Sequence, residues 1–146
     1  MPRLYSTLTL DDAKLMIRAA EEAAEQIGLP YNIAVVDAGG ALLAFVRQDG
    51  GKIGSVDVAI DKARTARLFD MDTSDLAPLA QSGGPLFGID QTNAGKVVIF
   101  GGGLLVRSGN DIIGSVGASA GTVEQDVVVA SAAIAALEKA QPSSAM

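Results

Sequence analysis

A lysine, an arginine and a threonine near the middle of the chain are the side chains best placed to bind a charged ligand. Lys62, Arg64 and Thr65 lie within about one turn of a predicted helix. Two cations beside a small hydroxyl can hold a ligand carboxylate through charge-assisted hydrogen bonds. The alternative is that the cations pair with Asp57 or Asp61 on the same helix. We expect Arg64 and Thr65 to make the first ligand contacts.

Two carboxylates are candidates for acid–base chemistry. Asp37 ends an apolar segment just before Gly39, so its carboxylate is expected to fold onto the N–H groups of the following turn. If Asp37 faces a cavity instead, burial would raise its pKa and make it a general base. Glu124 and Asp126 lie in the first turn of the last predicted helix, where negative charge complements free N–H groups. Glu124 becomes a candidate base if that turn opens onto the glycine triplet Gly101, Gly102 and Gly103.

A glycine triplet, Gly101, Gly102 and Gly103, opens a predicted hairpin and leaves its backbone bare. Either a helix packs closely against these glycines, or their N–H groups face a ligand. The longest irregular segment, Gln81–Gln91, contains Pro85 and has the length of a binding loop. We therefore predict a ligand site formed by the triplet, the Pro85 loop and the helix that carries Arg64 and Thr65.

The composition excludes several kinds of chemistry. The 146 residues include no cysteine and no histidine, which removes disulfides, thiol nucleophiles, Cys/His zinc sites and catalysis by a Ser-His-Asp triad. We predict no metal site. A net charge of −6 argues against nucleic acid as a partner. The longest apolar run is too short to span a membrane, and no hydrophobic leader follows Met1, so we expect a cytoplasmic protein.

The predicted elements indicate an α+β fold in a single domain, 1–146. They are, in chain order, a helix after Thr9, a hairpin of 31–36 and 41–46, helices at 55–69 and about 74–79, a hairpin within 97–121, a helix from Val123 to about Lys139, and a disordered tail over 140–146. This order does not alternate as in parallel sheets. The last helix is apolar almost all round, which predicts that it also forms a contact between copies of a homo-oligomer.

Several spaced motifs together resemble the GlcG/HbpS family over about residues 7–137. The motif residues are Val35-Val36-Asp37-Ala38-Gly39-Gly40, Lys62-Ala63-Arg64-Thr65-Ala66, Pro85, Gly101-Gly102-Gly103, Ile113-Gly114 and Glu124-Gln125-Asp126. The resemblance implies a profilin-like fold, with a central antiparallel sheet of about five strands flanked by helices, and assembly into homo-oligomers. It also implies haem as a cofactor of some members. This chain departs from that expectation because it lacks histidine, the commonest haem ligand.

Three functions follow as alternatives, and they leave the cofactor open. The first is a binding protein for a small anionic molecule or for a carboxylate-bearing cofactor such as haem, with Lys62, Arg64 and Thr65 near the ligand. The second is an isomerase, lyase or hydratase that uses Asp37 or Glu124 as base, while the N–H groups of the glycine triplet stabilise an enolate oxygen. The third is a structural oligomer without a cavity.

Overall fold

A computed structural model describes residues 1–141 of the chain. Its helices are α1 (Leu10–Ile27), α2 (Gly54–Phe69), α3 (Thr73–Leu79) and α4 (Val123–Ala140). Its strands are β1 (Asn32–Asp37), β2 (Leu42–Arg47), β3 (Gly103–Ser108) and β4 (Asp111–Ser119). Two short 3₁₀ helices, η1 (Ile89–Gln91) and η2 (Asn93–Gly95), lie between α3 and β3.

The strands form one antiparallel sheet in the order β2-β1-β4-β3. The predicted α+β class with an antiparallel sheet is confirmed, but the expected number of about five strands is wrong, because the described residues form four. The apolar segment 97–100 is not a strand. Its Val98 N–H donates to Thr65 Oγ1 at 3.1 Å, so the segment is attached to α2 and not to the sheet. Gly102, with φ +124°, then turns the chain into β3.

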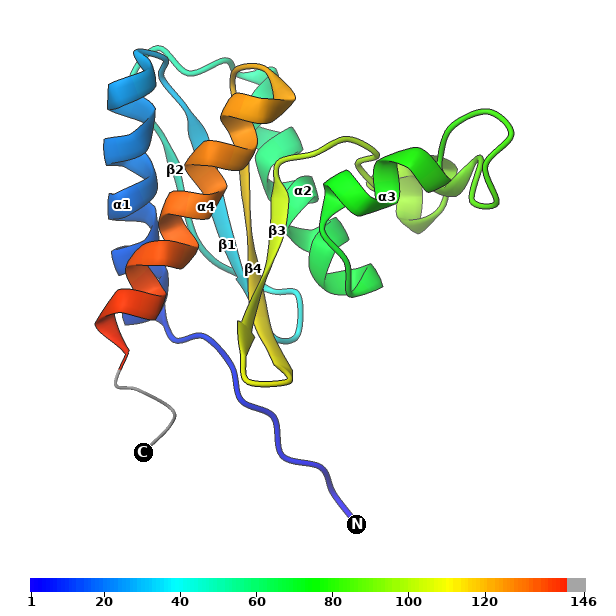
Figure 1. The fold of residues 1–146 in the computed structure, drawn as a ribbon, viewed down its shortest axis with the longest axis horizontal. Coiled ribbons are helices and arrows are strands. Elements are labelled where there is room, and N and C mark those ends of the chain that lie inside the picture. The colour runs from blue at the N-terminus through cyan, green and yellow to red at the C-terminus, as the bar shows by residue number, and fades with distance from the viewer. Residues whose placement is uncertain (142–146) are drawn as a thin grey trace.

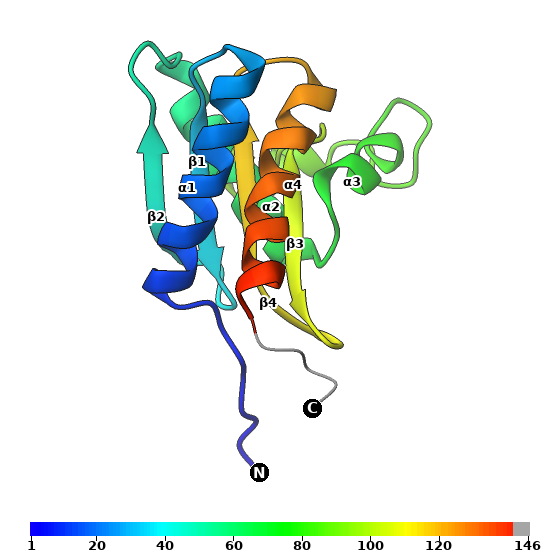
Figure 2. The ribbon, with the colours of Figure 1, turned by 60° about the vertical axis from the view of Figure 1, so that its left-hand side comes forward.

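Helices cover both faces of the sheet. Helices α1 and α4 lie side by side on one face, and α2 covers the other (Figure 2). Successive side chains of β1 point to opposite faces of the sheet and pack against different helices, as the period of two in a strand requires. Ile33 and Val35 pack with α1 and α4, whereas Ala34 and Val36 pack toward Ala63 of α2. Helix α3 and the loop after it project to one side of this body (Figure 1).

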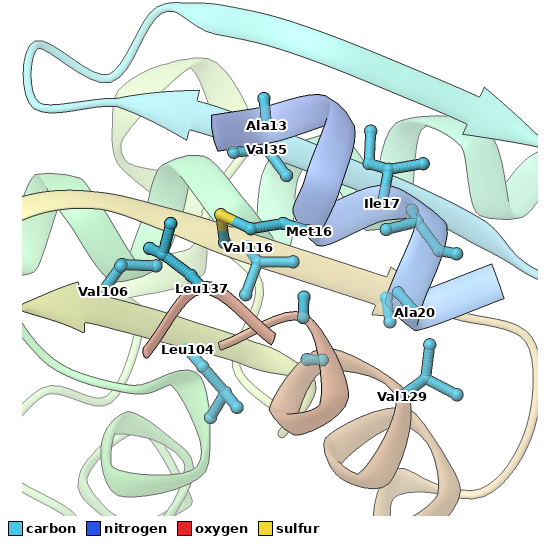
Figure 3. Packing of buried hydrophobic residues seen from close by; sticks show 14 of the residues in the cluster. Ala13, Met16, Ile17, Ala20, Val35, Leu104, Val106, Val116, Val129 and Leu137 are labelled. Carbon is cyan, nitrogen blue, oxygen red and sulfur yellow. The ribbon is translucent and has the colours of Figure 1, made fainter. Parts of the chain in front are cut away.

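The main core lies between the sheet and the pair α1 and α4. Figure 3 shows side chains from both helices converging on those of β1, β3 and β4. Small residues such as Ala20 of α1 and Ala133 of α4 are fully buried there, which lets the two helices approach closely. The scarcity of aromatic residues in the sequence is consistent with this aliphatic core.

On the opposite face, α2 lies almost directly on the backbone of the sheet. A Cβ at Gly103 of β3 would overlap the carbonyl of Lys62, and one at Gly117 of β4 would overlap the carbonyl of Ala59. The other triplet glycines are also closely covered. A Cβ at Gly101 would lie 2.7 Å from Val123 Cγ1, and one at Gly102 would lie 2.6 Å from Lys62 Nζ. The triplet therefore packs against α2 and α4, in agreement with the prediction that a helix lies close to these glycines. Contact between their N–H groups and a ligand stays a prediction.

The helix ends follow from local sequence signals. Thr9 and Asp12 form a capping box on α1, and Thr122 and Gln125 form another on α4. Of the tail predicted over 140–146, Ala140 is the last residue of α4, and 142–146 lie outside the described residues. No helix within 1–141 has the length and apolar character needed to cross a membrane.

Candidate functional site

Two cavities lie between α2 and the segment 90–100, and Lys96 and Val97 line both of them. We call the pair the α2 cleft and its members the cationic and the acidic compartment. The cationic compartment, of about 290 Å³, is lined by Arg64, Thr65 and Leu68 of α2 and by Asn93 and Ala94. The acidic compartment, of about 550 Å³, is lined by Asp57, Val58, Asp61, Asp90, Ile99 and Phe100, among others.

The cationic compartment holds two positive charges without a carboxylate partner. Among the described residues the ion pairs are Lys62–Asp126 and Arg67–Asp70, so neither Arg64 nor Lys96 belongs to one. The alternative in which Arg64 pairs with Asp57 or Asp61 is therefore not realised. A guanidinium and an ammonium on one small cleft can both donate to an incoming carboxylate.

Thr65 lies at this cleft but its hydroxyl is already engaged. The side chain is 2 % exposed, and Oγ1 accepts from the Val98 N–H at 3.1 Å and donates to the Lys96 carbonyl at 3.5 Å. These bonds fasten the segment that carries Lys96 onto α2. The structure thus gives Thr65 a role in positioning the cleft wall, and direct contact with a ligand stays a prediction.

Charges of the two compartments influence one another. Burial raises the pKa of the Asp61 carboxyl, and the negative charge of Asp57 raises it further. Lys96 and Arg64 act in the opposite direction and lower the pKa of Asp61. The cations of one compartment are therefore close enough to stabilise the carboxylate of the other.

Lys62 lies inside the protein and does not line the cleft. Its side chain is completely buried, and Nζ donates to Asp126 Oδ2 at 2.7 Å and to the Ala118 carbonyl at 3.0 Å. The predicted alternative, in which Lys62 pairs with Asp57 or Asp61, is thus wrong. Burial lowers the pKa of Lys62, and Asp126 partly opposes that effect. The ring of Phe100 covers the ammonium at 5.1 Å from its centroid, so one side chain separates Lys62 from the acidic compartment.

Asp126 is the centre of a buried network that the sequence analysis missed. Besides Lys62, its carboxylate accepts from the Tyr31 hydroxyl at 2.9 Å and from the backbone N–H groups of Ala120 and Gly121 at 3.2 and 3.0 Å. Burial, together with the Asp126 carboxylate, raises the pKa of Tyr31. Asp126 lies in the first turn of α4, as predicted, but its carboxylate takes part in this buried network, whereas Thr122 and Gln125 form the capping box of the helix.

The sequence did contain a signal for this network. Asp126 falls at helical spacing on the stripe of α4 that includes the buried residues Ala130, Ala133 and Leu137. A carboxylate on a buried stripe requires a partner of opposite charge. Lys62 was available as that partner, in a helix that is otherwise apolar on its sheet-facing side.

The other predicted site residues lie away from the α2 cleft. Asp37 Oδ1 accepts from the N–H groups of Gly39 and Ala41 at 2.9 and 3.0 Å, which confirms its expected role in the turn. Glu124 is exposed on the first turn of α4, and Pro85 is exposed in the projecting loop. Neither predicted base lines the cleft that holds Arg64, so their catalytic roles stay predictions.

A separate groove of about 510 Å³ lies beside Asp37, between Tyr5 and Leu68. Its cation is Arg67, which donates to the Ala38 carbonyl at 2.6 Å and pairs with Asp70 at 2.5 Å. This groove therefore offers an arginine that is already occupied, unlike Arg64. Within residues 1–141, acidic side chains form no group of three or more arranged to hold a metal ion.

Comparison with known proteins gives a consistent result. The family model described as "Haem degrading protein HbpS-like" matches residues 8–135. The Citrobacter freundii protein described as an uncharacterized 15.0 kDa protein in the dhaT-dhaS intergenic region is 41% identical over 129 residues, which are 88% of this chain and 91% of that protein. The crystal structure of Klebsiella pneumoniae protein ORFY is 35% identical, with a TM-score of 0.94 over 96% of this chain and 97% of its own.

The third relative is PduO. A crystal structure of a PduOC:heme complex is 37% identical, with a TM-score of 0.86 over 89% of this chain and 94% of that one. The complete corrinoid adenosyltransferase PduO of Salmonella typhimurium is also 37% identical, over 89% of this chain but only 39% of its own length. The chain therefore corresponds to a minor part of that enzyme.

Proposed function

This chain belongs to the GlcG/HbpS family, and from that premise we propose that it is a small-molecule-binding protein whose α2 cleft takes a carboxylate-bearing ligand. The observation that carries the proposal is that Arg64 and Lys96 line one compartment and neither forms an ion pair within the described residues. Because Thr65 fastens the segment that carries Lys96 to α2, the two cations are held on opposite walls of the cleft.

The acidic compartment adds an apolar wall. Val58 and Ile99 line it, together with Phe100, which is 44 % exposed. An exposed aromatic ring beside aliphatic side chains suits the apolar body of a ligand whose carboxylate lies at Arg64. The ligand class that fits both compartments is therefore an anion with an apolar portion.

Haem belongs to this class, and a relative is described in complex with it. Arg64 and Lys96 would hold the propionates, and Val58, Ile99 and Phe100 would contact the apolar macrocycle. An axial ligand for the iron is harder to identify, because the chain has no histidine and Met16 is completely buried in the core. Bound haem would supply a redox-active iron, whereas this chain's own residues would bind and orient the carboxylates. Our proposal therefore rests on carboxylate recognition and includes haem as one candidate.

A titration tests this proposal. Purified protein is titrated with hemin, followed by the Soret band, and separately with 2-oxobutanoate, followed by NMR line broadening. Arg64→Gln should weaken binding about tenfold to a hundredfold, since a hydrogen bond to a charged group contributes about 1.5–3 kcal/mol. Arg107→Gln, which removes an exposed arginine of β3, is the matched control and should bind like the wild type. Failure of both probes to bind would refute the proposal.

We also propose that the protein self-associates. Helix α4 leaves Val128 55 % exposed and Val123 39 % exposed, and the projecting loop leaves Phe87 70 % exposed. Contact with a second copy of the chain would remove such apolar side chains from water, which is favourable. Light scattering during size-exclusion chromatography should give a mass that is a multiple of the monomer mass, and Val128→Lys should lower it. A monomeric mass for the wild type at high micromolar concentration would contradict this proposal.

A further inference from the structure

We propose that Asp61 is the proton-transferring group of the α2 cleft, and that it acts on the carbon next to the carbonyl of a 2-oxo acid whose carboxylate is bound by Arg64 and Lys96. This inference rests on the proposed function, because it assumes that the cationic compartment binds a carboxylate. It goes beyond that function by assigning a reaction and a residue that carries it out.

The position of Asp61 supports this assignment. Asp61 precedes Arg64 by three residues on α2, so the two side chains are neighbours on the helix surface. Asp61 lines the acidic compartment, and Lys96 lines both compartments. Within the described residues, no side-chain hydrogen bond or ion pair involves the Asp61 carboxylate. By contrast, the turn after Asp37 occupies an oxygen of that carboxylate, so Asp61 is the carboxylate better placed for proton transfer.

The electrostatic surroundings of Asp61 support the same role. The groups that face it are Asp57 and Arg64 on α2, Asp90 on η1, and Lys96 on the segment after η2. Burial and Asp57 raise the pKa of Asp61, against the effect of the two cations. A carboxylate with a raised pKa is a stronger base than an ordinary one and works closer to neutral pH.

The chemistry is a reversible enolisation. The Asp61 carboxylate removes a proton from C3, the electron pair of that C–H bond forms the C2–C3 double bond, and the carbonyl electron pair moves to the C2 oxygen. The Lys96 ammonium stabilises the resulting enolate oxygen. Return of a proton from Asp61 to C3 restores the 2-oxo acid, so the step needs no oxidant, reductant or co-reactant. In D₂O the protonated Asp61 carboxyl exchanges its hydrogen with solvent before the return step, so C3 receives deuterium.

Deuterium exchange into 2-oxobutanoate tests the inference. This probe carries two hydrogens on C3, and a base on one side of a fixed ligand removes only one of them. We expect wild-type protein in D₂O to give product with a single deuterium at C3, measured by proton NMR. Asp61→Asn should lower the rate at least about a hundredfold, the usual contribution of a positioned base, with binding retained. Asp75→Asn, an exposed carboxylate of α3, should exchange like the wild type.

The possible failures can be told apart because binding is measured by line broadening in the same samples. Binding that depends on Arg64, without exchange above the buffer rate, overturns the inference and leaves the proposed function intact. Exchange of both C3 hydrogens at equal rates, or full activity in Asp61→Asn, also overturns it. Absence of binding overturns the proposed function and the inference together.

Discussion

Lys62 of α2 and Asp126 of α4 are 64 residues apart in sequence, and their side chains meet in the interior at 2.7 Å. Their helices belong to different layers, and the ion pair connects these layers at the end of β4, where Lys62 Nζ also donates to the Ala118 carbonyl. Tyr31 and two backbone N–H groups satisfy the other carboxylate oxygen. The charges are therefore buried with partners on nearly every side, as burial of charge requires.

We expect removal of one member of this ion pair to be strongly destabilising. Lys62→Met should lower the free energy of unfolding by about 3–5 kcal/mol, because it leaves the Asp126 carboxylate buried without its counter-charge. Lys62→Met combined with Asp126→Leu should recover part of that loss. Asp70→Asn, which removes the exposed pair with Arg67, should change stability by less than about 1 kcal/mol. Urea denaturation measures all three, and a mild effect of Lys62→Met alone would contradict the buried pairing.

Because α2 packs closely on the sheet, we expect a single added methyl group at this interface to lower the stability of the protein. Gly117→Ala places a Cβ on the carbonyl of Ala59 and should destabilise the protein by about 1–3 kcal/mol through overpacking. Gly54→Ala is the matched control, because a Cβ there meets nothing within 4 Å. That variant should be neutral or more stable by about 0.4–1 kcal/mol. Equal melting temperatures for both variants would refute the description of this interface.

The hydroxyl of Thr65 is predicted to hold the cleft wall in place. Thr65→Val keeps the shape but leaves the Val98 N–H without its acceptor, which should lower stability by about 1–3 kcal/mol. The same change should speed hydrogen exchange of the Val98 amide and weaken ligand binding. Thr65→Ser retains the hydroxyl and should restore slow exchange. If slow exchange persists in the valine variant, the hydroxyl does not fasten the segment.

The buried Tyr31 predicts loss of stability in alkaline solution. Burial and Asp126 raise the pKa of Tyr31 above the ordinary value of 10.0. As the pH rises above 10, the unfolded chain loses the phenol proton while the folded protein retains it, so the free energy of unfolding falls. The stabilising contribution is complete below pH 10 and is lost as the pH rises through the folded-state pKa.

Absorbance at 295 nm measures this directly. In a Tyr5→Phe background, Tyr31 is the remaining tyrosine of the chain. Its ionisation should coincide with alkaline unfolding followed by circular dichroism. Ionisation of a folded protein near pH 10 would show that Tyr31 is not held as the structure describes.

Local signals in the sequence predicted most of the fold. The capping residues Thr9 and Thr122 marked the starts of α1 and α4. The order of the predicted helices and strands, which does not alternate as in parallel sheets, indicated the α+β class. The number of about five strands, which the family resemblance implied, was wrong, and the strand-like residues of the 97–100 segment do not form an additional strand. The hydrogen bond from Val98 to Thr65, a contact over 33 residues, decides their conformation, and no local pattern contains it.

The candidate site was only partly predictable for a similar reason. Arg64 and Thr65 were identified from residue type and spacing, and both line the cleft. Lys62 is two residues before Arg64, yet the helical rotation turns it inward to Asp126 while Arg64 faces outward. Lys96 was missed because a single lysine in an irregular segment has no sequence pattern that points to a partner.

The glycines beneath α2 also fix the position of the helical wall of the cleft before a ligand binds. With the carbonyls of Ala59 and Lys62 lying against Gly117 and Gly103, the helix has no room to slide along the sheet. Arg64 is part of that helix, so its backbone has a fixed place before any ligand arrives. This wall is already ordered when the protein folds, so ligand binding loses less conformational entropy there. The α2 cleft is thus preorganised on its helical side, and the bonds of Thr65 extend this order to the segment that carries Lys96.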